Sequence, residues 1–468
     1  MNTAQLVVIG GGPGGYPAAF LAADLGLSVT LVDTEPTPGG VCLHRGCIPS
    51  KALLHVARLI TEAAEAERWG VTFGKPQVDL ARLRAWKDGV VTKLTGGLGQ
   101  LSRQRGVRFL EGRARFESPA RLRITGAGGS EQRMDFQHAI VSTGSRPAAL
   151  PGWPDSERIW NSTDALRLDT VPGTLLVVGG GYIGLELGSV YATLGTKVTV
   201  VEMMPGLLPG ADRDLVTPLA RRLDQLFAHI LLNAKVTSVR EDPSGVRVRL
   251  EGPEVREPER VFDRILVSVG RKPNSEDLGL DTTRVEVDAK GFIKTDGQRR
   301  TAEPAIFAIG DVAGEPMLAH KATHEGRVAV DSITGKKSVF DPRAIPGVVF
   351  TDPEVAWCGL TETQAQQNGI AVKATRFPWA ASGRATTLDR GDGVTKIIAD
   401  PDTGRLLGVG IAGPGAGELI SEAALAIEMG ATAGDLKLTI HPHPTLSETL
   451  MEAAEMFYGH CTHSFRKK

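Results

Sequence analysis

The amino-terminal part of the chain alternates apolar runs with a glycine-rich turn. Residues 6–9 are apolar, 10–15 contain only glycine and proline, 16–26 have helical character, and 27–33 form a second apolar run. This order predicts a strand, a turn, a helix and a second strand, which is the unit that opens a doubly wound α/β domain.

The glycines of this turn have the spacing of a dinucleotide-binding motif. Gly10, Gly12 and Gly15 fit G-x-G-x-x-G, and Asp33 closes the second strand about twenty residues further on. The helix start offers free N–H groups to a pyrophosphate, and the carboxylate can accept hydrogen bonds from a ribose. A purely structural turn can also use glycines, but strand, helix and acid in register favour dinucleotide binding.

The same unit recurs at residues 174–202. Gly179, Gly181 and Gly184 repeat the motif, and Glu202 stands at the end of the following strand. Two such units imply two dinucleotides in one enzyme, a bound flavin and an exchangeable nicotinamide. An acid at position 202 accepts from a free 2′-hydroxyl and repels a 2′-phosphate, so NAD(H) is favoured over NADP(H).

Three further apolar segments end in glycine. Residues 138–147 and 264–274 are each a strand followed by a turn, and we expect them to end the two nucleotide domains. Residues 305–312 predict a buried strand that delivers Gly310 and Asp311 to its carboxyl end, where open α/β sheets place ligand contacts.

The pattern changes from about Pro346. Strand-rich segments, such as 393–400 and 406–413, are followed by a helical run at 416–430. This order is typical of a separate α+β domain. The predicted fold class is therefore α/β, with two Rossmann-like dinucleotide-binding domains and an α+β C-terminal domain.

Composition narrows the function classes. The chain has 468 residues, 41% hydrophobic and 23% charged, which predicts a globular protein of two to four domains. The net charge of −1 leaves no excess of positive charge that would attract nucleic acid. The chain contains no run of eighteen apolar residues, so no membrane-spanning helix is expected. The first strand is predicted to begin within a few residues of Met1, so we expect no targeting peptide. Four cysteines in a chain of this length are too few for the disulfide framework of a secreted protein, so we expect the protein to be in the reducing cytoplasm.

Two of the four cysteines, Cys42 and Cys47, are five positions apart, whereas Cys358 and Cys461 are isolated. A metal or iron–sulfur site usually needs three or four close ligands. Two inert buried thiols are a second interpretation. A redox-active disulfide is the third and is favoured, because a disulfide in the cytosol is more often catalytic than structural.

A regular helix would hold this pair too far apart. Five helical positions advance about 7.5 Å, and a disulfide tolerates at most about 7 Å between Cα atoms. The segment must be distorted, and Gly46 and Pro49 supply the means. Cys47 falls near the start of the next helix, whose dipole favours a thiolate.

Residues 39–54, GGVCLHRGCIPSKALL, resemble the active-site segment of the flavin-dependent disulfide reductases, and within them the branch that oxidises dihydrolipoyl groups. The resemblance covers essentially the whole chain. It includes the segments IGGGPGG, STGSRP, GGGYIGLELG, VGRKPN, AIGDV, MLAHKATHEG, FTDPEVAWCGLTE and HPHPTLSE, the last of which is highly specific to this family.

The resemblance implies roles around the sulfur pair. Cys42 is the interchange thiol that exchanges with substrate sulfur, and Cys47 faces the flavin as the charge-transfer thiolate. Lys51 is implied to lie near the flavin N5 and to pair with Glu186. The alternative for Lys51 is a solvated helix lysine.

The resemblance also implies a base in HPHPTLSE. Thiol–disulfide exchange needs a thiolate, and histidine titrates in the range that suits a proton acceptor. His443 is followed five residues later by Glu448, which can orient the imidazole as the acid of a triad does. His441 is the nearest competitor.

The cofactor contacts expected from the motifs and the resemblance form two sets, and no metal is expected. The FAD set is Gly10, Gly12, Gly15, Asp33, Lys51, Ala114, Thr143, Gly144, Asp311 and Ala319, and the NAD set is Gly179, Gly181, Gly184, Glu202, Val236 and Gly270.

Four domains are expected: FAD-binding (1–148), NAD-binding (149–271), a central domain that completes the FAD site (272–345) and an interface domain (346–468). The resemblance implies a homodimer in which dihydrolipoyl groups reduce the disulfide, FAD takes the electrons and NAD⁺ is reduced. The partners would be lipoyl domains and the acyltransferase core of 2-oxo acid dehydrogenase or glycine-cleavage complexes.

Three alternatives compete with this function. Glutathione reductases read an NADP phosphate with basic residues where this chain has Glu202. Mercuric reductases carry a C-terminal cysteine pair, whereas Cys461 is alone. A non-catalytic docking subunit is the third alternative, and complete redox motifs argue against it.

The chain departs from the common family pattern between the cysteines. His44 and Arg45 stand where Asn-Val is commoner. Arg45 could stabilise a thiolate or point to solvent, and it puts the substrate fit in doubt. Tyr182 in the second glycine motif could cover the flavin face until the nicotinamide arrives.

Overall fold

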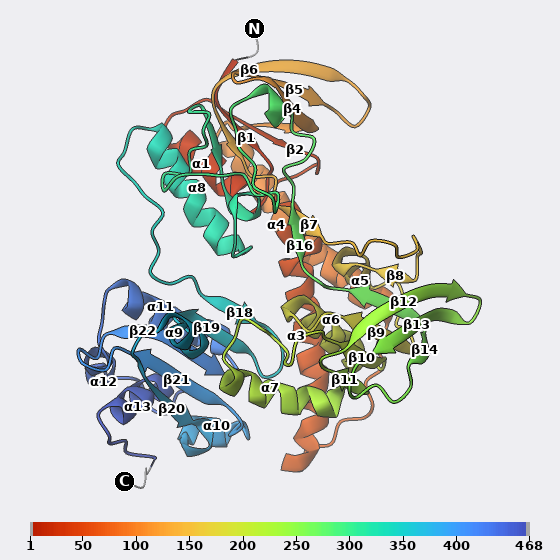
Figure 1. Ribbon diagram of the computed structural model, residues 1–468, viewed down its shortest axis with the longest axis vertical. Helices are drawn as coiled ribbons and strands as arrows, with labels where there is room; N and C mark the ends of the chain where they lie inside the picture. Colours follow the sequence, from red (N-terminus) through yellow and green to blue (C-terminus); the bar gives the residue numbers. More distant parts are fainter. Residues whose placement is uncertain (1–2, 465–468) are drawn as a thin grey trace.

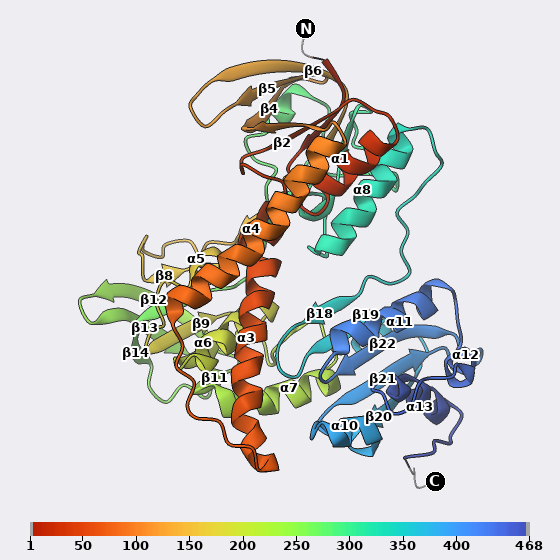
Figure 2. The same cartoon turned by 180° about the vertical axis from the view of Figure 1, so that it is seen from behind.

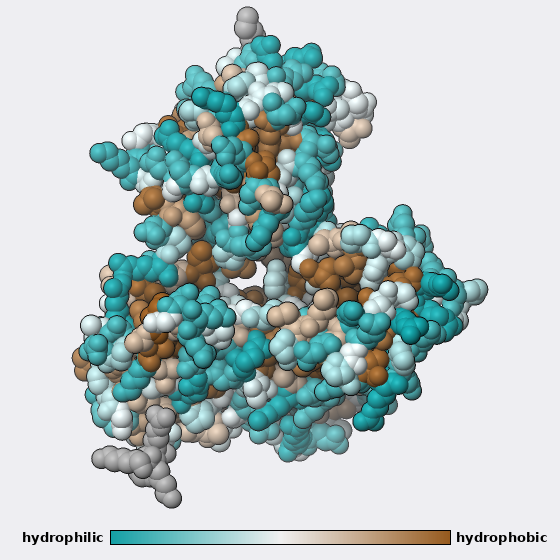
Figure 3. Space-filling model, in the orientation of Figure 1, coloured by the Kyte–Doolittle hydropathy of each residue, from teal (hydrophilic) through white to brown (hydrophobic). Residues whose placement is uncertain are grey.

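The computed structural model describes residues 3–464. The chain forms three lobes, with the N-terminal lobe at the top of Figure 1 and the two others below it. The space-filling view shows the three lobes around a central opening (Figure 3). Among the described residues, no helix has both the length and the apolar character needed to cross a bilayer.

The N-terminal lobe is built on a sheet whose strand order is β3-β2-β1-β6-β5-β4. The predicted opening unit is confirmed, because a strand, a glycine turn, a helix and a second strand follow one another. Leu6 and Val8 are fully buried on one face of the sheet and Val7 on the other, as expected for a strand covered on both faces. The elements of this lobe are β1 (Thr3–Ile9), α1 (Gly15–Asp24), β2 (Val29–Asp33), β3 (Arg108–Glu111), β4 (Arg113–Ser118), β5 (Arg121–Thr125) and β6 (Glu131–Val141).

Two long helices connect this lobe to the rest of the molecule. They are α3 (Cys47–Glu65) and α4 (Leu80–Gln104), which run side by side through the centre of Figure 2. A short helix, α2 (Gly40–Arg45), precedes α3, and a 3₁₀ turn (Ala66–Trp69) follows it.

Residues 272–345 fold back onto the N-terminal lobe. Strand β17 (Ile306–Ala308) pairs in parallel with β6, and α8 (Ala319–Ile333) packs against α1. The two strand-and-turn segments singled out in the sequence begin in different sheets, and only short strands near their ends pair with each other. These are β7 (Ser145–Pro147) and β16 (Arg271–Pro273). Short 3₁₀ turns lie at Leu280–Thr282 and Gly310–Ala313.

The second lobe repeats the parallel architecture with strand order β11-β10-β9-β15-β8. A three-stranded antiparallel sheet, β12-β13-β14, is attached to it. The elements are β8 (Ile159–Trp160), α5 (Ser162–Arg167), β9 (Thr174–Val178), α6 (Tyr182–Thr193), β10 (Lys197–Val201), α7 (Arg213–Leu226), β11 (His229–Leu231), β12 (Lys235–Asp242), β13 (Gly245–Glu251), β14 (Glu259–Phe262) and β15 (Arg264–Val267).

The third lobe is the predicted α+β unit. Its antiparallel sheet has the order β18-β19-β22-β21-β20, with α11 and α13 packed against it. The elements are β18 (Gly347–Val349), β19 (Val355–Gly359), α9 (Glu362–Asn368), β20 (Lys373–Pro378), a 3₁₀ turn (Trp379–Ala381), α10 (Gly383–Thr387), β21 (Val394–Ala399), β22 (Leu406–Ala412), α11 (Ala416–Glu428), α12 (Ala433–Leu438) and α13 (Glu448–Phe457).

Candidate active site

The cysteine pair spans a break between two helices. Cys42 lies in α2 and Cys47 is the first residue of α3. The break is at Gly46, where a side chain would meet the Val41 carbonyl oxygen at 2.8 Å. Pro49 lies in the first turn of α3, where its missing N–H costs no helical bond. The predicted distortion is therefore present, and it is centred on Gly46.

The two cysteine sulfurs are hydrogen-bonded to each other and differ in acidity. All four cysteines are free in the structure. A hydrogen bond from the Cys42 thiol, opposed in part by burial and assisted by the Lys51 charge, lowers the pKa of Cys47 to about 7. The same hydrogen bond and burial raise the pKa of Cys42. Cys47 is thus the thiolate of the pair near neutral pH, and Cys42 keeps its proton.

Lys51 is paired rather than solvated. Its Nζ lies 2.8 Å from Glu186 Oε2 and 4.5 Å from the centre of the Phe350 ring. Glu186 is buried, and its Oε1 also accepts the Phe350 backbone N–H at 3.0 Å. These contacts fix the ammonium group one helical turn from Cys47.

We expect Lys51→Met to raise the pKa of Cys47 by roughly one unit, because the nearest positive charge is removed. The pH dependence of Cys47 alkylation in the reduced protein, with the label located by mass spectrometry, measures this shift. Arg45→Met is the matched control, since Arg45 pairs with Glu35 instead. An unchanged midpoint in Lys51→Met would contradict the electrostatic role.

The sulfur pair lies on the wall of a cavity of about 710 Å³. The cavity is also lined by Tyr182 and by Glu186. The predicted residues that it brings together are Gly10, Gly12, Asp33, Cys42, Cys47, Lys51, Ala114, Thr143, Gly144, Asp311 and Ala319. Of the predicted FAD set only Gly15 is not on the wall, because it packs against the Gly10 carbonyl where α1 crosses the turn.

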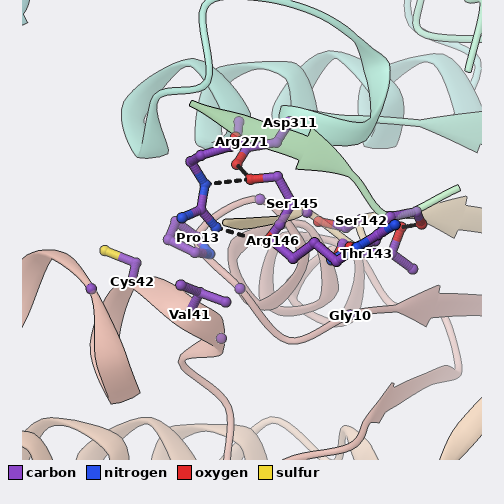
Figure 4. Close-up of a pocket in the computed structure, with 18 of the residues that line it drawn as sticks. Gly10, Pro13, Val41, Cys42, Ser142, Thr143, Ser145, Arg146, Arg271 and Asp311 are labelled. Atoms are coloured by element: carbon purple, nitrogen blue, oxygen red, sulfur yellow. Dashed lines mark hydrogen bonds between the residues drawn. The ribbon is translucent and has the colours of Figure 1, made fainter. Parts of the chain in front are cut away.

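Arg271 is a cavity residue that the sequence analysis missed. Its Nε and Nη2 lie 2.7 Å from the hydroxyl and carbonyl oxygens of Ser145. The Ser145 hydroxyl in turn donates to Asp311 at 2.5 Å. Figure 4 shows this chain of contacts, with Cys42 on the short helix nearby. The only signal in the sequence was that Arg271 lies in the family segment VGRKPN. The neighbouring residues do not distinguish this arginine from one that is exposed to solvent.

The cavity fits a dinucleotide. Among the described residues, no side chain caps the start of α1, so its N–H groups are available to a pyrophosphate. Gly144 has φ +69°, and a Cβ there would project into open space rather than into protein. Asp33 accepts backbone N–H groups of Gly11 and Glu35 and still has lone pairs for a ribose. The predicted FAD contacts stay a prediction, which this geometry supports.

The second glycine motif has the same construction. Glu202 is nearly buried, and its two oxygens accept the N–H groups of Gly180 and Met204 at 2.6 and 2.7 Å. Among the described residues, no side chain caps α6 after Gly181. Two glycines, Gly179 and Gly184, hold α6 close to the end of β9.

The remaining two residues of the NAD set lie outside that motif. Val236 is on β12 of the attached antiparallel sheet, and Gly270 directly precedes β16 with φ +115°. Tyr182 begins α6 and lines the large cavity, where burial raises its pKa to about 12. The second nucleotide unit therefore adjoins the sulfur pair through Tyr182.

The two unusual residues between the cysteines bind the loop after β2. Arg45 forms an ion pair with Glu35, and His44 Nε2 lies 3.1 Å from the Thr37 carbonyl oxygen. The Arg45 side chain is 37% exposed and lines the same cavity as the cysteines, so the ion pair with Glu35 adds to the two alternatives without deciding between them. Both contacts connect the segment between Cys42 and Cys47 to the loop that follows Asp33.

His443 and Glu448 form a dyad in the third lobe. His443 Nδ1 lies 2.9 Å from Glu448 Oε1, and its side chain is 75% exposed. Burial acts to raise the pKa of Glu448, but the Thr445 N–H and His443 outweigh it, and the net pKa is lowered. Both ring nitrogens of His441 are engaged, with Glu422 and the Thr439 carbonyl.

The single chain does not bring this dyad to the sulfur pair. Within residues 3–464, none of the cavity-lining positions lies beyond Ala322. The cysteines and His443 are therefore on separate surfaces of one chain.

The family follows from comparison with known proteins. The model for pyridine nucleotide-disulphide oxidoreductases matches residues 4–326, and the dimerisation-domain model of the same family matches 345–454. The chain belongs to the pyridine nucleotide-disulphide oxidoreductase family. The predicted family and fold class are confirmed. The chain is an oxidoreductase, and FAD and NAD(H), predicted from the two glycine motifs, are the cofactors of the family branch to which its relatives belong.

Relatives match over their full length. A dihydrolipoyl dehydrogenase of Vibrio parahaemolyticus is 49% identical over 466 residues, covering 99% of this chain and 98% of the relative. One of Thermus scotoductus is 47% identical over 465 residues, with 99% of each chain covered.

Two solved structures share the fold. LpdA of Mycobacterium tuberculosis has a TM-score of 0.89 and 29% identity, and the HOCl-induced flavoprotein disulfide reductase RclA of Escherichia coli has a TM-score of 0.85 and 28% identity. Each match covers 97% of this chain and 99% of the other.

Proposed function

We propose that this protein is a dihydrolipoyl dehydrogenase, which oxidises the dithiol of a dihydrolipoyl group and reduces NAD⁺. The observation that carries the proposal is the pair of sulfurs of unequal acidity, Cys42 and Cys47, on the wall of a cavity that the first glycine motif also lines. The names of the full-length relatives support it.

The difference in acidity supports the proposed roles of the two sulfurs. A substrate thiolate attacks Cys42 Sγ of the oxidised pair, and Cys47 leaves, because the thiol of lower pKa is the better leaving group. The second substrate thiol then attacks the substrate sulfur bound to Cys42, which closes the lipoyl ring. The substrate loses two electrons, and the cysteine pair gains them.

Protons follow the same assignment. The proton of the first substrate thiol passes to Nε2 of His443, whose Nδ1 is held by Glu448. The proton of the second ends on Cys42, whose pKa is raised. Glu448 stays ionised near neutral pH, since its pKa is lowered, and stabilises the imidazolium.

The cavity residues would hold FAD, which supplies a two-electron acceptor for the dithiol and a donor for NAD⁺. Asp33 would bind the ribose of its adenosine and Asp311 its ribityl chain. Lys51, fixed by Glu186, places a positive charge beside Cys47. Ala114, Thr143, Gly144 and Ala319 would complete the wall.

Glu202 is expected to select NAD⁺. Its buried carboxylate would face the 2′ position of the adenosine ribose, where a phosphate would be repelled. We expect kcat/KM with NAD⁺ to exceed that with NADP⁺ at least tenfold, about 1.4 kcal/mol. Steady-state kinetics with both cofactors measure the ratio, and equal efficiencies would contradict it. Glu202→Gln should bring kcat/KM with NADP⁺ closer to kcat/KM with NAD⁺.

The protein is proposed to work as a homodimer. The family's dimerisation domain spans the third lobe. Apolar side chains project from that lobe into solvent in the single chain, as expected for a face that a second copy covers. They are Leu425 (64% exposed), Met429 (78%), Leu438 (79%) and Ile440 (95%). His443 is close to them in sequence, so the partner subunit's dyad would complete each site.

We further propose cytoplasmic lipoyl domains and the acyltransferase core of 2-oxo acid dehydrogenase or glycine-cleavage complexes as partners. We propose the same domain boundaries as the sequence analysis, namely 1–148, 149–271, 272–345 and 346–468. The fold adds that 272–345 packs onto the first of these units.

A substrate panel tests the function. Purified yellow enzyme should turn over dihydrolipoamide with NAD⁺ and should be nearly inactive with glutathione disulfide and NADPH. The reverse preference would assign the chain to a glutathione-type reductase. Inactivity with every disulfide and dithiol, in protein that has bound FAD, would favour a docking role.

A further inference from the structure

The segment MLAHKATHEG (317–326), which leads into α8, carries two buried charged side chains that the proposed reaction does not use. Lys321 and Glu325 are one helical turn apart, and their side chains are 4% and 0% exposed. Lys321 Nζ lies 3.3 Å from Glu325 Oε1, and Arg299 Nη1 lies 2.8 Å from the same oxygen. Buried charges are costly unless they are paired and hydrogen-bonded. The further hydrogen bonds of this pair therefore indicate what it holds in place.

Both side chains bind the turn that follows β17. The Gly310 N–H donates to Glu325 Oε2 at 2.6 Å. Lys321 Nζ donates to the carbonyl oxygens of Gly310 at 3.3 Å and of Gly314 at 2.7 Å, so its three N–H groups all have partners. Gly310 is buried and has φ +73°. The 3₁₀ turn Gly310–Ala313 is thus attached to α8 at its first residue and directly after its last.

This turn carries Asp311 to the cavity. Asp311 follows Gly310 directly, lines the cavity and accepts the Ser145 hydroxyl (Figure 4). The cavity wall includes Gly310 and Asp311, but neither Lys321 nor Glu325. The two charged side chains lie behind the wall, so they can act on a bound cofactor only through the backbone that they hold.

Helix α8 is in turn attached to the first glycine motif. Thr323 Oγ1 donates to the Pro13 carbonyl oxygen at 2.7 Å. A Cβ at Gly326 would meet the Gly14 carbonyl oxygen at 2.9 Å, so the helix lies directly against that turn. One helix therefore sets the distance between the glycine turn of the first motif and the turn that carries Asp311.

We propose that Lys321 and Glu325 are positioning residues of the FAD site, which hold the Gly310 backbone so that Asp311 faces the ribityl chain. If either side chain were apolar, buried backbone groups would lose their hydrogen-bond partners, which is unfavourable. The turn would then have to move to find other partners. The inference rests on the proposed contact of Asp311, but not on the proposed oxidation of dihydrolipoyl groups.

The rate of FAD release from the diluted full-length holoenzyme, followed by flavin fluorescence, tests the role of Lys321. Lys321→Met should release FAD roughly tenfold faster or more, the factor that corresponds to the loss of one buried hydrogen bond. ADP lacks the ribityl chain, so its inhibition constant against FAD rebinding should be unchanged. Lys336→Met is the matched control, because Lys336 forms an exposed pair with Asp331 near the other end of α8. This control should release FAD at the wild-type rate.

Two substitutions of Glu325 separate positioning from charge balance. Glu325→Gln and Glu325→Leu both remove the charge, but only glutamine offers an oxygen to the Gly310 N–H, so it should retain FAD much better than leucine. Circular dichroism verifies that each variant is folded. Equal release rates in these two variants, wild-type release in Lys321→Met, or a parallel loss of ADP binding would overturn the proposal. Asp311→Ala should also release FAD faster, and wild-type release there would remove the contact on which the inference rests while leaving the dihydrolipoyl reaction untouched.

Discussion

Replacing His443 with glutamine should lower kcat for dihydrolipoamide oxidation by about 10²–10⁴-fold, the usual contribution of a positioned general base. Glutamine keeps the approximate size of the side chain but cannot take a proton. The exposed imidazole has Nδ1 held by Glu448, which leaves Nε2 free for the substrate thiol. Steady-state turnover of dihydrolipoamide with NAD⁺ measures the loss.

Two comparisons separate a base from a structural histidine. His441→Gln is the matched control, because both of its nitrogens are engaged within the lobe, and it should retain most of the activity. Reduction of a one-electron dye by NADH needs no substrate thiol, so it should proceed in His443→Gln as in the wild type. Equal losses in both histidine variants, or a parallel loss of dye reduction, would show that His443 only supports the fold.

Features set by neighbouring residues were predictable from the sequence. The two glycine units appear with their strands, helices and terminal acids, because Asp33 and Glu202 stand at the end of short apolar runs whose length and β-branched residues favour a buried strand. The break at Gly46 was predictable because a regular helix cannot bring Cys42 and Cys47 within disulfide distance. The sequence analysis also gave Pro49 a role in this break. Pro49 lies in the first turn of α3, where a proline is compatible with a regular helix.

Features set by distant pairing were not predictable. Strand β17 joins the first sheet more than 160 residues after β6, and no local pattern indicates which sheet it enters. The same holds for Arg271, which reaches Ser145 only because β16 pairs with β7. A three-residue strand carries too little periodicity to predict its partner. Sequence motifs identified most of the cavity wall, whereas the contacts between its two halves came from tertiary structure.

The separation of His443 from the sulfur pair leads to a prediction about mixed dimers. A Cys47→Ser chain lacks the leaving thiolate, and a His443→Gln chain lacks the base, so each homodimer should be nearly inactive. If the partner subunit supplies the dyad, a mixed dimer has one site with both lesions and one site with neither. Unfolding the two proteins together and refolding them should therefore restore activity.

The expected recovery is about one quarter of wild-type activity, since a closed dimer has two equivalent shared sites. Random pairing makes half of the dimers mixed, and half of their sites are intact. Distinct affinity tags on the two chains isolate the mixed dimer, whose activity should be about half that of the wild type. A Cys42→Ser chain refolded with Cys47→Ser is the control that cannot recover, because the sulfur pair of every site then carries one of the two lesions. Purified mixed dimers of Cys47→Ser and His443→Gln that stay inactive would place the whole site within one subunit. That outcome would require a rearrangement that carries the third lobe to the cavity, since none of the described residues beyond Ala322 lines it.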